Sequence, residues 1–165
     1  MIPRAMMIAT LVAAVGSCVM AGAFFAFSSF VMGALGRLAP PEGIRAMQSM
    51  NVVAINPVFL GVFTGTALLC GVLAVLSIKS WSAPGSGLRL AGCMAYVVGS
   101  FALTMVCNVP RNDALAALAA DTADAAAYWA RYLSEWTWWN HVRMLASVVG
   151  SVLLVAAQLV GRGAP

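Results

Sequence analysis

Eight consecutive residues late in the sequence, Trp136 to Arg143, carry side chains that suit chemistry. They read WTWWNHVR and hold three of the chain's five tryptophans and its one histidine. An imidazole can act as a general base near neutral pH, and a guanidinium can hold an anionic substrate or an oxyanion. A long apolar run follows directly, so this polar cluster lies at the mouth of a hydrophobic segment.

A helix through this cluster would place Trp136, Asn140 and Arg143 on one face, at about 100° per residue. His141 would point away from that face. The cluster is therefore expected to form one wall of a site, and other segments must supply the remaining walls.

The composition assigns those segments to a membrane. The chain is 62% hydrophobic and only 8% charged, whereas soluble domains carry about a quarter charged residues. A helix crosses the hydrocarbon core with about 20 apolar residues, and four stretches qualify: 6–35, 55–78, 88–107 and 141–161. We predict an all-α fold, an integral membrane four-helix bundle that forms a single domain over residues 1–165. The first apolar run is too long for a cleaved signal peptide and is interpreted as a retained span.

The two longer connections, 36–55 and 108–140, are each expected to hold a short interfacial helix. Pro41 and Glu42 suit the first turn of the helix in the first connection. The second connection should begin where Pro110 ends the third span, and its helix should cover 128–132. Asn56 and Pro57 predict the capped start of the second span.

Four spans put both termini and the 79–87 turn on one side of the membrane and the longer connections on the other. All five acidic residues then fall on the second side, together with Gln48, Asn51, Asn108 and Asn112. Uncharged donors and acceptors of this kind suit a phenolic or quinone-like ligand. We expect the site on this side, in the cell membrane, with the termini in the cytoplasm because short segments with Lys and Arg weigh most in orientation.

Several functions are excluded by the sequence. Nine scattered Lys and Arg residues make no basic patch, so nucleic acid is not an expected partner. The four cysteines lie in apolar runs without a C-x-x-C pair and are expected to be buried thiols. One histidine and no acid within a span disfavour a zinc or di-iron site. Gly61 with Gly65, and Gly92 with Gly99, are expected to pack helices closely; a homo-oligomer remains open.

Structural interpretations stand beside the chemical ones. His141 could bond a backbone carbonyl at the interface, and Arg143 could extend to lipid headgroups. The tryptophans could form an interfacial belt, and Asn112 and Asp113 could cap a helix.

Four sequence blocks resemble a known family. They are Met47 to Asn51 (MQSMN), Asn56-Pro57, Asn108 to Asp113 (NVPRND) and Trp136 to Arg143. Their order and spacing are similar to those of the DUF1772 family of small four-span proteins, which includes the anthrone oxygenases of polyketide pathways. The resemblance covers nearly the whole chain. It implies oxidation of an anthrone-like phenol to a quinone by dioxygen, without a nicotinamide or flavin.

The resemblance also suggests roles for individual residues. His141 would be the base, and Arg143 and Asn108 would stabilise negative charge. The expected substrate-binding residues are Gln48, Asn51, Asn112, Trp136, Trp139 and Asn140. The expected partners are the lipid bilayer and a small aromatic or phenolic substrate, with no metal and no cofactor. The alternatives are a haem protein with His141 as ligand, a quinone-binding redox protein, and a non-enzymatic accessory subunit.

Overall fold

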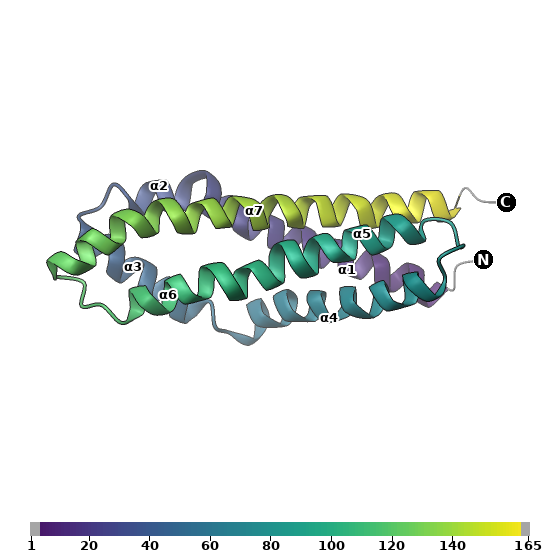
Figure 1. Cartoon of the computed structure of the whole chain (residues 1–165), viewed down its shortest axis with the longest axis horizontal. Helices are drawn as coiled ribbons and strands as arrows, with labels where there is room; N and C mark the ends of the chain where they lie inside the picture. Colours follow the sequence, from purple (N-terminus) through teal and green to yellow (C-terminus); the bar gives the residue numbers. More distant parts are fainter. Residues whose placement is uncertain (1–3, 163–165) are drawn as a thin grey trace.

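The computed structural model describes residues 4–162 as helices joined by short turns (Figure 1). Within this part of the chain, four helical runs are long and apolar enough to cross a membrane: Arg4–Leu35, Pro57–Lys79, Ser86–Ala116 and Ala123–Gly161. The predicted all-α, multi-pass membrane fold is confirmed.

Two of the four runs, the first and the third, consist of several named elements. The first consists of α1 (Arg4–Ala26), the π-helical η1 (Phe27–Val31) and α2 (Met32–Leu35). It is followed by α3 (Pro40–Val53) and by α4 (Pro57–Lys79), which is the second run. The third consists of α5 (Ser86–Tyr96), the π-helical η2 (Val97–Ala102) and η3 (Thr104–Asn108), and α6 (Val109–Ala116). The fourth is α7 (Ala123–Arg162), a single helix of 40 residues.

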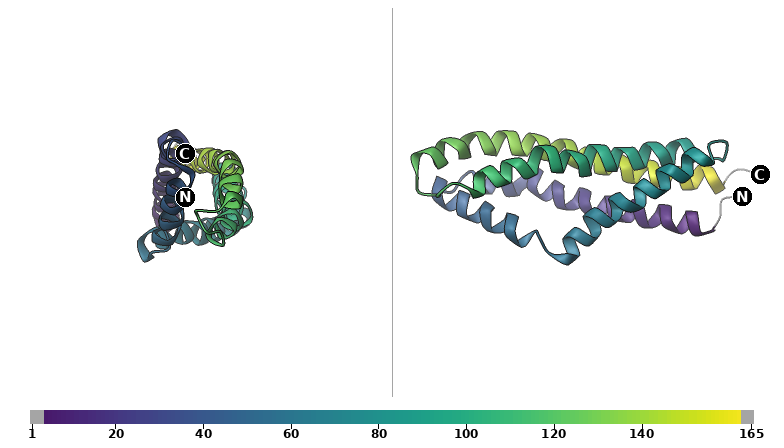
Figure 2. Two further views of the ribbon diagram at one scale, coloured as in Figure 1. Left: turned by 90° about the vertical axis from the view of Figure 1, so that its left-hand side faces the viewer. Right: turned by 60° about the horizontal axis from the view of Figure 1, so that its bottom comes forward.

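The runs pack as a bundle in which α1 and α5 each contact both α4 and α7. Seen end-on, they surround a common axis (Figure 2, left). The α4–α5 turn lies at one end of the bundle, and the α2–α3 and α6–α7 connections lie at the other (Figure 1). The predicted arrangement of the connections on two sides is therefore present.

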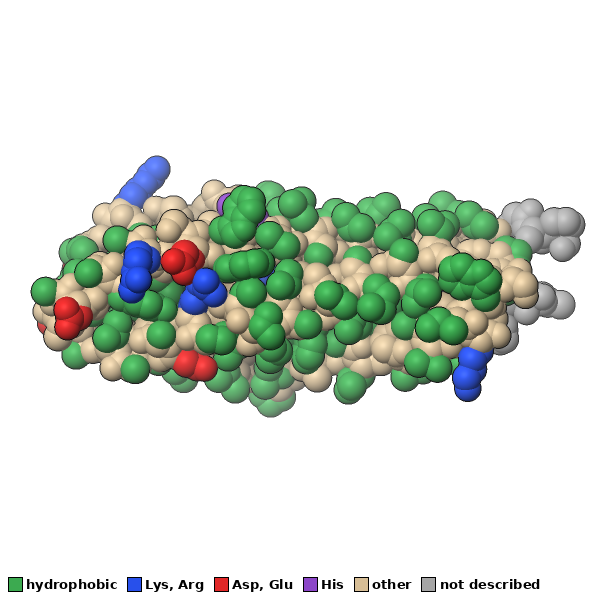
Figure 3. Space-filling view, in the orientation of Figure 1, with side chains coloured by type: hydrophobic (Ala, Val, Ile, Leu, Met, Phe, Trp, Pro, Cys, Tyr) green, Lys and Arg blue, Asp and Glu red, His purple; other side chains and the backbone are tan. Residues whose placement is uncertain are grey.

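Two hydrophobic clusters stabilise the two halves of the molecule. One joins α1, α4, α5 and α7 around residues such as Met20, Phe63 and Leu154. The other joins α2, α3, α6 and the first part of α7 around Ile44, Leu115 and Trp129. Because α7 is about 60 Å long and a hydrocarbon core is about 30 Å thick, the core cannot enclose the whole length of the bundle. Charged side chains gather at the end of the visible face that holds the second cluster (Figure 3).

The first connection agrees with the sequence prediction. Helix α3 carries proline in its first turn, followed by Glu42. The side-chain oxygen of Asn56 accepts hydrogen bonds from the amides of Val58 (3.1 Å) and Phe59 (3.0 Å) and caps α4.

The second connection differs from the prediction. Pro110 does not end the third span, because it lies in the first turn of α6. The preceding η3 changes the hydrogen-bond register there, and the Arg111 side chain donates from Nη1 to the Cys107 carbonyl at 2.7 Å. The expected separate helix at 128–132 is instead the first part of α7. No glycine or proline occurs between residues 123 and 149, so nothing in this sequence interrupts the helix.

The glycines of the third run allow two helices to approach closely, but the glycines of α4 do not. A Cβ atom on Gly92 would lie 3.0 Å from the Gly150 carbonyl oxygen, and one on Gly99 would lie 2.6 Å from Ala146 Cβ. Helices α5 and α7 therefore meet through small residues, as predicted. Gly61 and Gly65 face open space within 4 Å, so they pack no helix of the described chain.

Candidate functional site

A cavity of about 310 Å³ lies where the α3–α4 corner faces η1, η3, α6 and α7. Its aromatic lining residues are Phe24, Phe27, Phe59, Phe63 and Trp136. Its polar lining residues are Gln48, Asn51, Thr104, Asn112, Asp113 and Arg143. Aromatic walls with a few converging polar groups are typical of a small-molecule site.

The guanidinium of Arg143 lies between two aromatic rings of the lining. Its Cζ is 4.2 Å from the ring centre of Phe24 and 4.7 Å from that of Trp136. Cation–π attraction strengthens where water is excluded, and Arg143 is only 6% exposed. The rings thus fix the plane of this cation.

Hydrogen bonds also hold the guanidinium of Arg143 in place. Nε donates to Asn140 Oδ1 at 3.0 Å, and Nη1 donates to Thr104 Oγ1 at 3.3 Å. Asn140 is itself held, because its Nδ2 donates to the Phe24 carbonyl and to Ser28 Oγ, both at 2.7 Å. Arg143 is therefore positioned by α1, η1, η3 and its own helix.

Arg143 has no anionic partner in the part of the chain that the structure describes. The ion pairs found there join Arg45 to Asp121 and Arg111 to Glu135, outside the cavity. No hydrogen bond within residues 4–162 involves Nη2 of Arg143. An unpaired buried cation is costly, so the arrangement favours an anion in the cavity.

Two amides that line the cavity, Gln48 and Asn112, keep unused hydrogen-bonding groups. Asn112 Oδ1 accepts from Tyr132 Oη and Trp136 Nε1, both at 2.8 Å, which leaves its amino group as a donor. Gln48 Nε2 donates to the carbonyls of Leu115 (2.9 Å) and Leu118 (3.1 Å), which leaves its oxygen as an acceptor. Asn112 is thus neither a helix cap nor a solvent-facing amide.

The π-helical stretches bring several of these groups to the site. Phe27 and Ser28 come from η1, and Thr104 comes from η3. A π-helical turn inserts an extra residue and changes the direction in which the following side chains point. Such stretches often occur at functional sites, and here both flank Arg143.

Four predicted site residues lie outside the cavity lining. One of them is Asn140, whose Oδ1 accepts from Arg143 Nε. His141 and Trp139 are half-buried and are not among the lining residues. Asn108 is fully buried and donates from Nδ2 to the Trp136 carbonyl at 3.2 Å, so it joins η3 to α7. The structure therefore places His141 and Asn108 outside the lining of this cavity, and the catalytic roles expected for them stay predictions.

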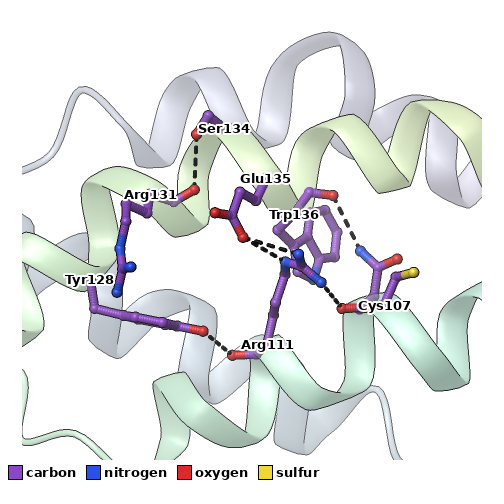
Figure 4. A network of polar contacts seen from close by, with 8 residues as sticks. Cys107, Arg111, Tyr128, Arg131, Ser134, Glu135 and Trp136 are labelled. Carbon is purple, nitrogen blue, oxygen red and sulfur yellow. Dashed lines mark hydrogen bonds and ion pairs between the residues drawn. The ribbon is translucent and has the colours of Figure 1, made fainter.

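A second polar network lies beside the cavity and fastens α6 to α7 (Figure 4). Arg111 Nε donates to Glu135 Oε2 at 3.0 Å, and Tyr128 Oη donates to the Arg111 carbonyl at 3.2 Å. The network keeps the helix that carries Asn112 and Asp113 against α7.

The sequence prediction missed Thr104, Asp113 and the four phenylalanines of the lining. Phe59 and Phe63 follow the Asn56 cap by about one and two turns on the same helix face, so helical spacing could have placed them at the level of the site. Asp113 follows Asn112 directly, but the sequence predicted only a helix cap at this position. Phe24 and Phe27 carried no local signal among the many apolar residues of the first span.

The fold and the cavity define a class, a four-span helical membrane protein with a buried cation in an aromatic pocket. Residues 58–153 match the family model of the anthrone oxygenases. Since the match covers more than half of the chain, the protein belongs to this family. The matched segment includes Thr104, Asp113 and Arg143 but not α1 or α3. Searches of curated proteins and of solved structures returned no match.

Proposed function

We propose that the cavity binds an electron-rich polycyclic phenol of the anthrone class and oxidises it to a quinone with dioxygen. The observation that carries the proposal is Arg143, an unpaired cation buried between aromatic rings. Such a cation stabilises an aromatic oxyanion through its charge, while the aromatic rings of the cavity stack against the flat faces of the substrate. Membership of the anthrone oxygenase family supports the same chemistry.

The reaction can take all its electrons from the substrate. Removal of a proton from the anthrone methylene gives a delocalised anion that reduces dioxygen and forms a carbon–oxygen bond at that carbon. Loss of water from the resulting hydroperoxide leaves a carbonyl group. One anthrone and one dioxygen thus give one quinone and one water, so we propose that no bound cofactor is needed.

We assign the roles by position in the cavity. Arg143 holds the oxyanion, with Thr104 and Asn140 as positioning residues. Asp113 is the carboxylate among the lining residues, and we assign it the role of proton acceptor in place of His141. Asn112 donates to a second substrate oxygen, and Gln48 accepts from a phenolic hydroxyl.

The test is oxidation of 1,8-dihydroxyanthrone by purified protein in liposomes, followed by oxygen uptake and quinone absorbance. We expect protein-dependent turnover, and we expect Arg143→Met to lower kcat/KM by about 100-fold or more. Arg131→Met is the matched control, because Arg131 is exposed and stacks on Tyr128 outside the cavity. Turnover no faster than in empty liposomes, or equal loss in both variants, would contradict the proposal.

We further propose that the protein lies in the cell membrane with the α4–α5 turn in the cytoplasm. Lys79 lies beside that short turn, whereas Arg45 and Arg111 belong to longer segments at the other end. Charges in short segments weigh most in membrane orientation.

A further inference from the structure

The corner between α3 and α4 exposes apolar side chains. Val52, Val53, Ile55 and Val58 are 71%, 69%, 73% and 78% exposed. The corner projects from the bundle (Figure 2, right), and hydrophobic side chains cover it along the lower edge of Figure 3. Apolar surface this exposed is stable in lipid and unfavourable in water.

The position of the corner along the bundle is consistent with lipid. Helix α4 has 23 residues, a length of about 34 Å, and ends at Lys79. That length matches a hydrocarbon core of about 30 Å, so the start of α4 lies at the opposite boundary of the core. The corner therefore lies at the level of the outermost hydrocarbon on the site side.

Hydrogen bonds within the corner satisfy most of its backbone amides, as an apolar medium favours. Asn56 accepts from the amides of Val58 and Phe59, and its Nδ2 donates to the Val53 carbonyl at 2.8 Å. The amides of Ala54 and Ile55 donate to the carbonyls of Met50 (2.9 Å) and Val52 (3.1 Å). One side chain thus closes the turn without water.

Two of the four exposed apolar residues of this corner also line the cavity. Val52 and Ile55 line it, as does Leu60, which is 40% exposed. Side chains that face both the outside and the interior form the rim of an opening. The acidic lining residue Asp113 lies on α6, across the cavity from this rim.

We infer that Val52 and Ile55 form a lateral portal through which an uncharged, lipid-soluble polycyclic phenol passes from the bilayer into the cavity. This inference rests on the proposed function for the substrate class. The phenol loses its proton inside, next to Arg143, because the neutral form crosses the apolar rim at lower cost than the anion. The substrate class is therefore a lipophilic phenol dissolved in the membrane.

The test measures the binding kinetics of 1,8-dihydroxyanthraquinone, a stable product-like probe, by quenching of tryptophan fluorescence in liposomes. The Cys18→Ala protein, which lacks the exposed native thiol, receives Ile55→Cys and is alkylated with a bulky lipid-soluble maleimide after folding. Blocking should slow association and dissociation by about tenfold each and leave Kd unchanged, because a portal changes the path and not the bound state. Val58→Cys, treated identically, is the control, since Val58 is equally exposed but does not line the cavity.

Each outcome has one meaning. Rates that are unchanged by the block at residue 55, or slowed equally at residue 58, overturn the portal. A block that changes the oligomeric state but not the rates also overturns it and assigns the corner to a protein contact. If the probe binds through a blockable portal but the protein oxidises no anthrone, the proposed function fails and the portal stands.

Discussion

Asp113 is the acidic side chain of the cavity lining, and its assigned role makes a distinct prediction at the scale of one residue. Asp113→Asn keeps the shape and polarity of the side chain but removes the proton acceptor. We expect kcat for anthrone oxidation to fall about 100-fold, while the Kd of the quinone probe stays within twofold of wild type. Stopped-flow absorbance and fluorescence quenching measure the two quantities.

Asp124→Asn is the control for this change, because Asp124 is exposed in the first turn of α7 and does not line the cavity. Full activity in Asp113→Asn would remove Asp113 from the reaction.

For His141, in contrast to Asp113, we expect little effect of substitution on turnover. Its side chain is half-buried on a different face of α7 from Arg143 and does not line the cavity. We expect His141→Ala to retain at least half of wild-type turnover, measured under the same conditions. Loss of turnover in a protein that still binds the quinone probe would return His141 to the mechanism. An absorption spectrum of wild type and variant tests haem ligation at the same time.

The sequence predicted part of the site at this scale, and helical periodicity explains which part. It placed Trp136, Asn140 and Arg143 on one face of a helix, and all three meet in the structure. It did not separate Asn108 from Asn112, which an ordinary helix would put on one face. Because Asn108 lies in a π-helical stretch and Asn112 in the α-helix after it, one binds a backbone carbonyl and the other reaches the cavity.

At the scale of elements, the close approach of α5 to α7 leaves no room for a larger side chain at Gly92. A methyl group on Gly92 would lie 3.0 Å from the Gly150 carbonyl oxygen and 3.0 Å from Leu154 Cγ. Gly92→Ala must therefore separate the two helices, and we expect a loss of about 1–3 kcal/mol in the free energy of unfolding. Unfolding by SDS in mixed micelles measures it.

Gly61→Ala is the matched control, since a methyl group there meets nothing within 4 Å. Helix propensity alone should make this variant neutral or more stable by up to about 1 kcal/mol. Destabilisation of Gly61→Ala in an oligomer, but not in the monomer, would show that α4 packs against a second copy of the chain.

Helix boundaries were predictable where a side chain caps the first amides of a helix. They were unpredictable where a side chain bonds a backbone carbonyl near a proline. Asn56 and Pro57 mark the start of α4 because their bonding is local. The continuation of the third run past Pro110 depends on the Arg111 side chain and on the register of η3. Neither is visible in a pattern of residue types.

At the scale of the whole molecule, the proposed orientation can be tested with single cysteines in the Cys18→Ala background. Ser82 in the α4–α5 turn and Ala119 in the α6–α7 connection are both exposed and lie at opposite ends of the bundle (Figure 1). We expect a membrane-impermeant maleimide added to intact cells to label Ala119→Cys and not Ser82→Cys. The reverse pattern would invert the orientation, and labelling of both would contradict the four-span topology.

The whole account depends on one claim, that the buried cation Arg143 stabilises a phenolate in the cavity. The direct measurement is the pKa of a phenol bound there, from a spectrophotometric titration of 1,8-dihydroxyanthraquinone in liposomes with and without protein. We predict that binding to wild-type protein lowers this pKa by about one pH unit, which corresponds to ~1.4 kcal/mol. In Arg143→Met the pKa should rise above its value in empty liposomes, because a cavity without the cation disfavours the anion. A bound phenol that ionises at the same pH as in empty liposomes, or at a higher one, in wild-type protein would contradict the claim.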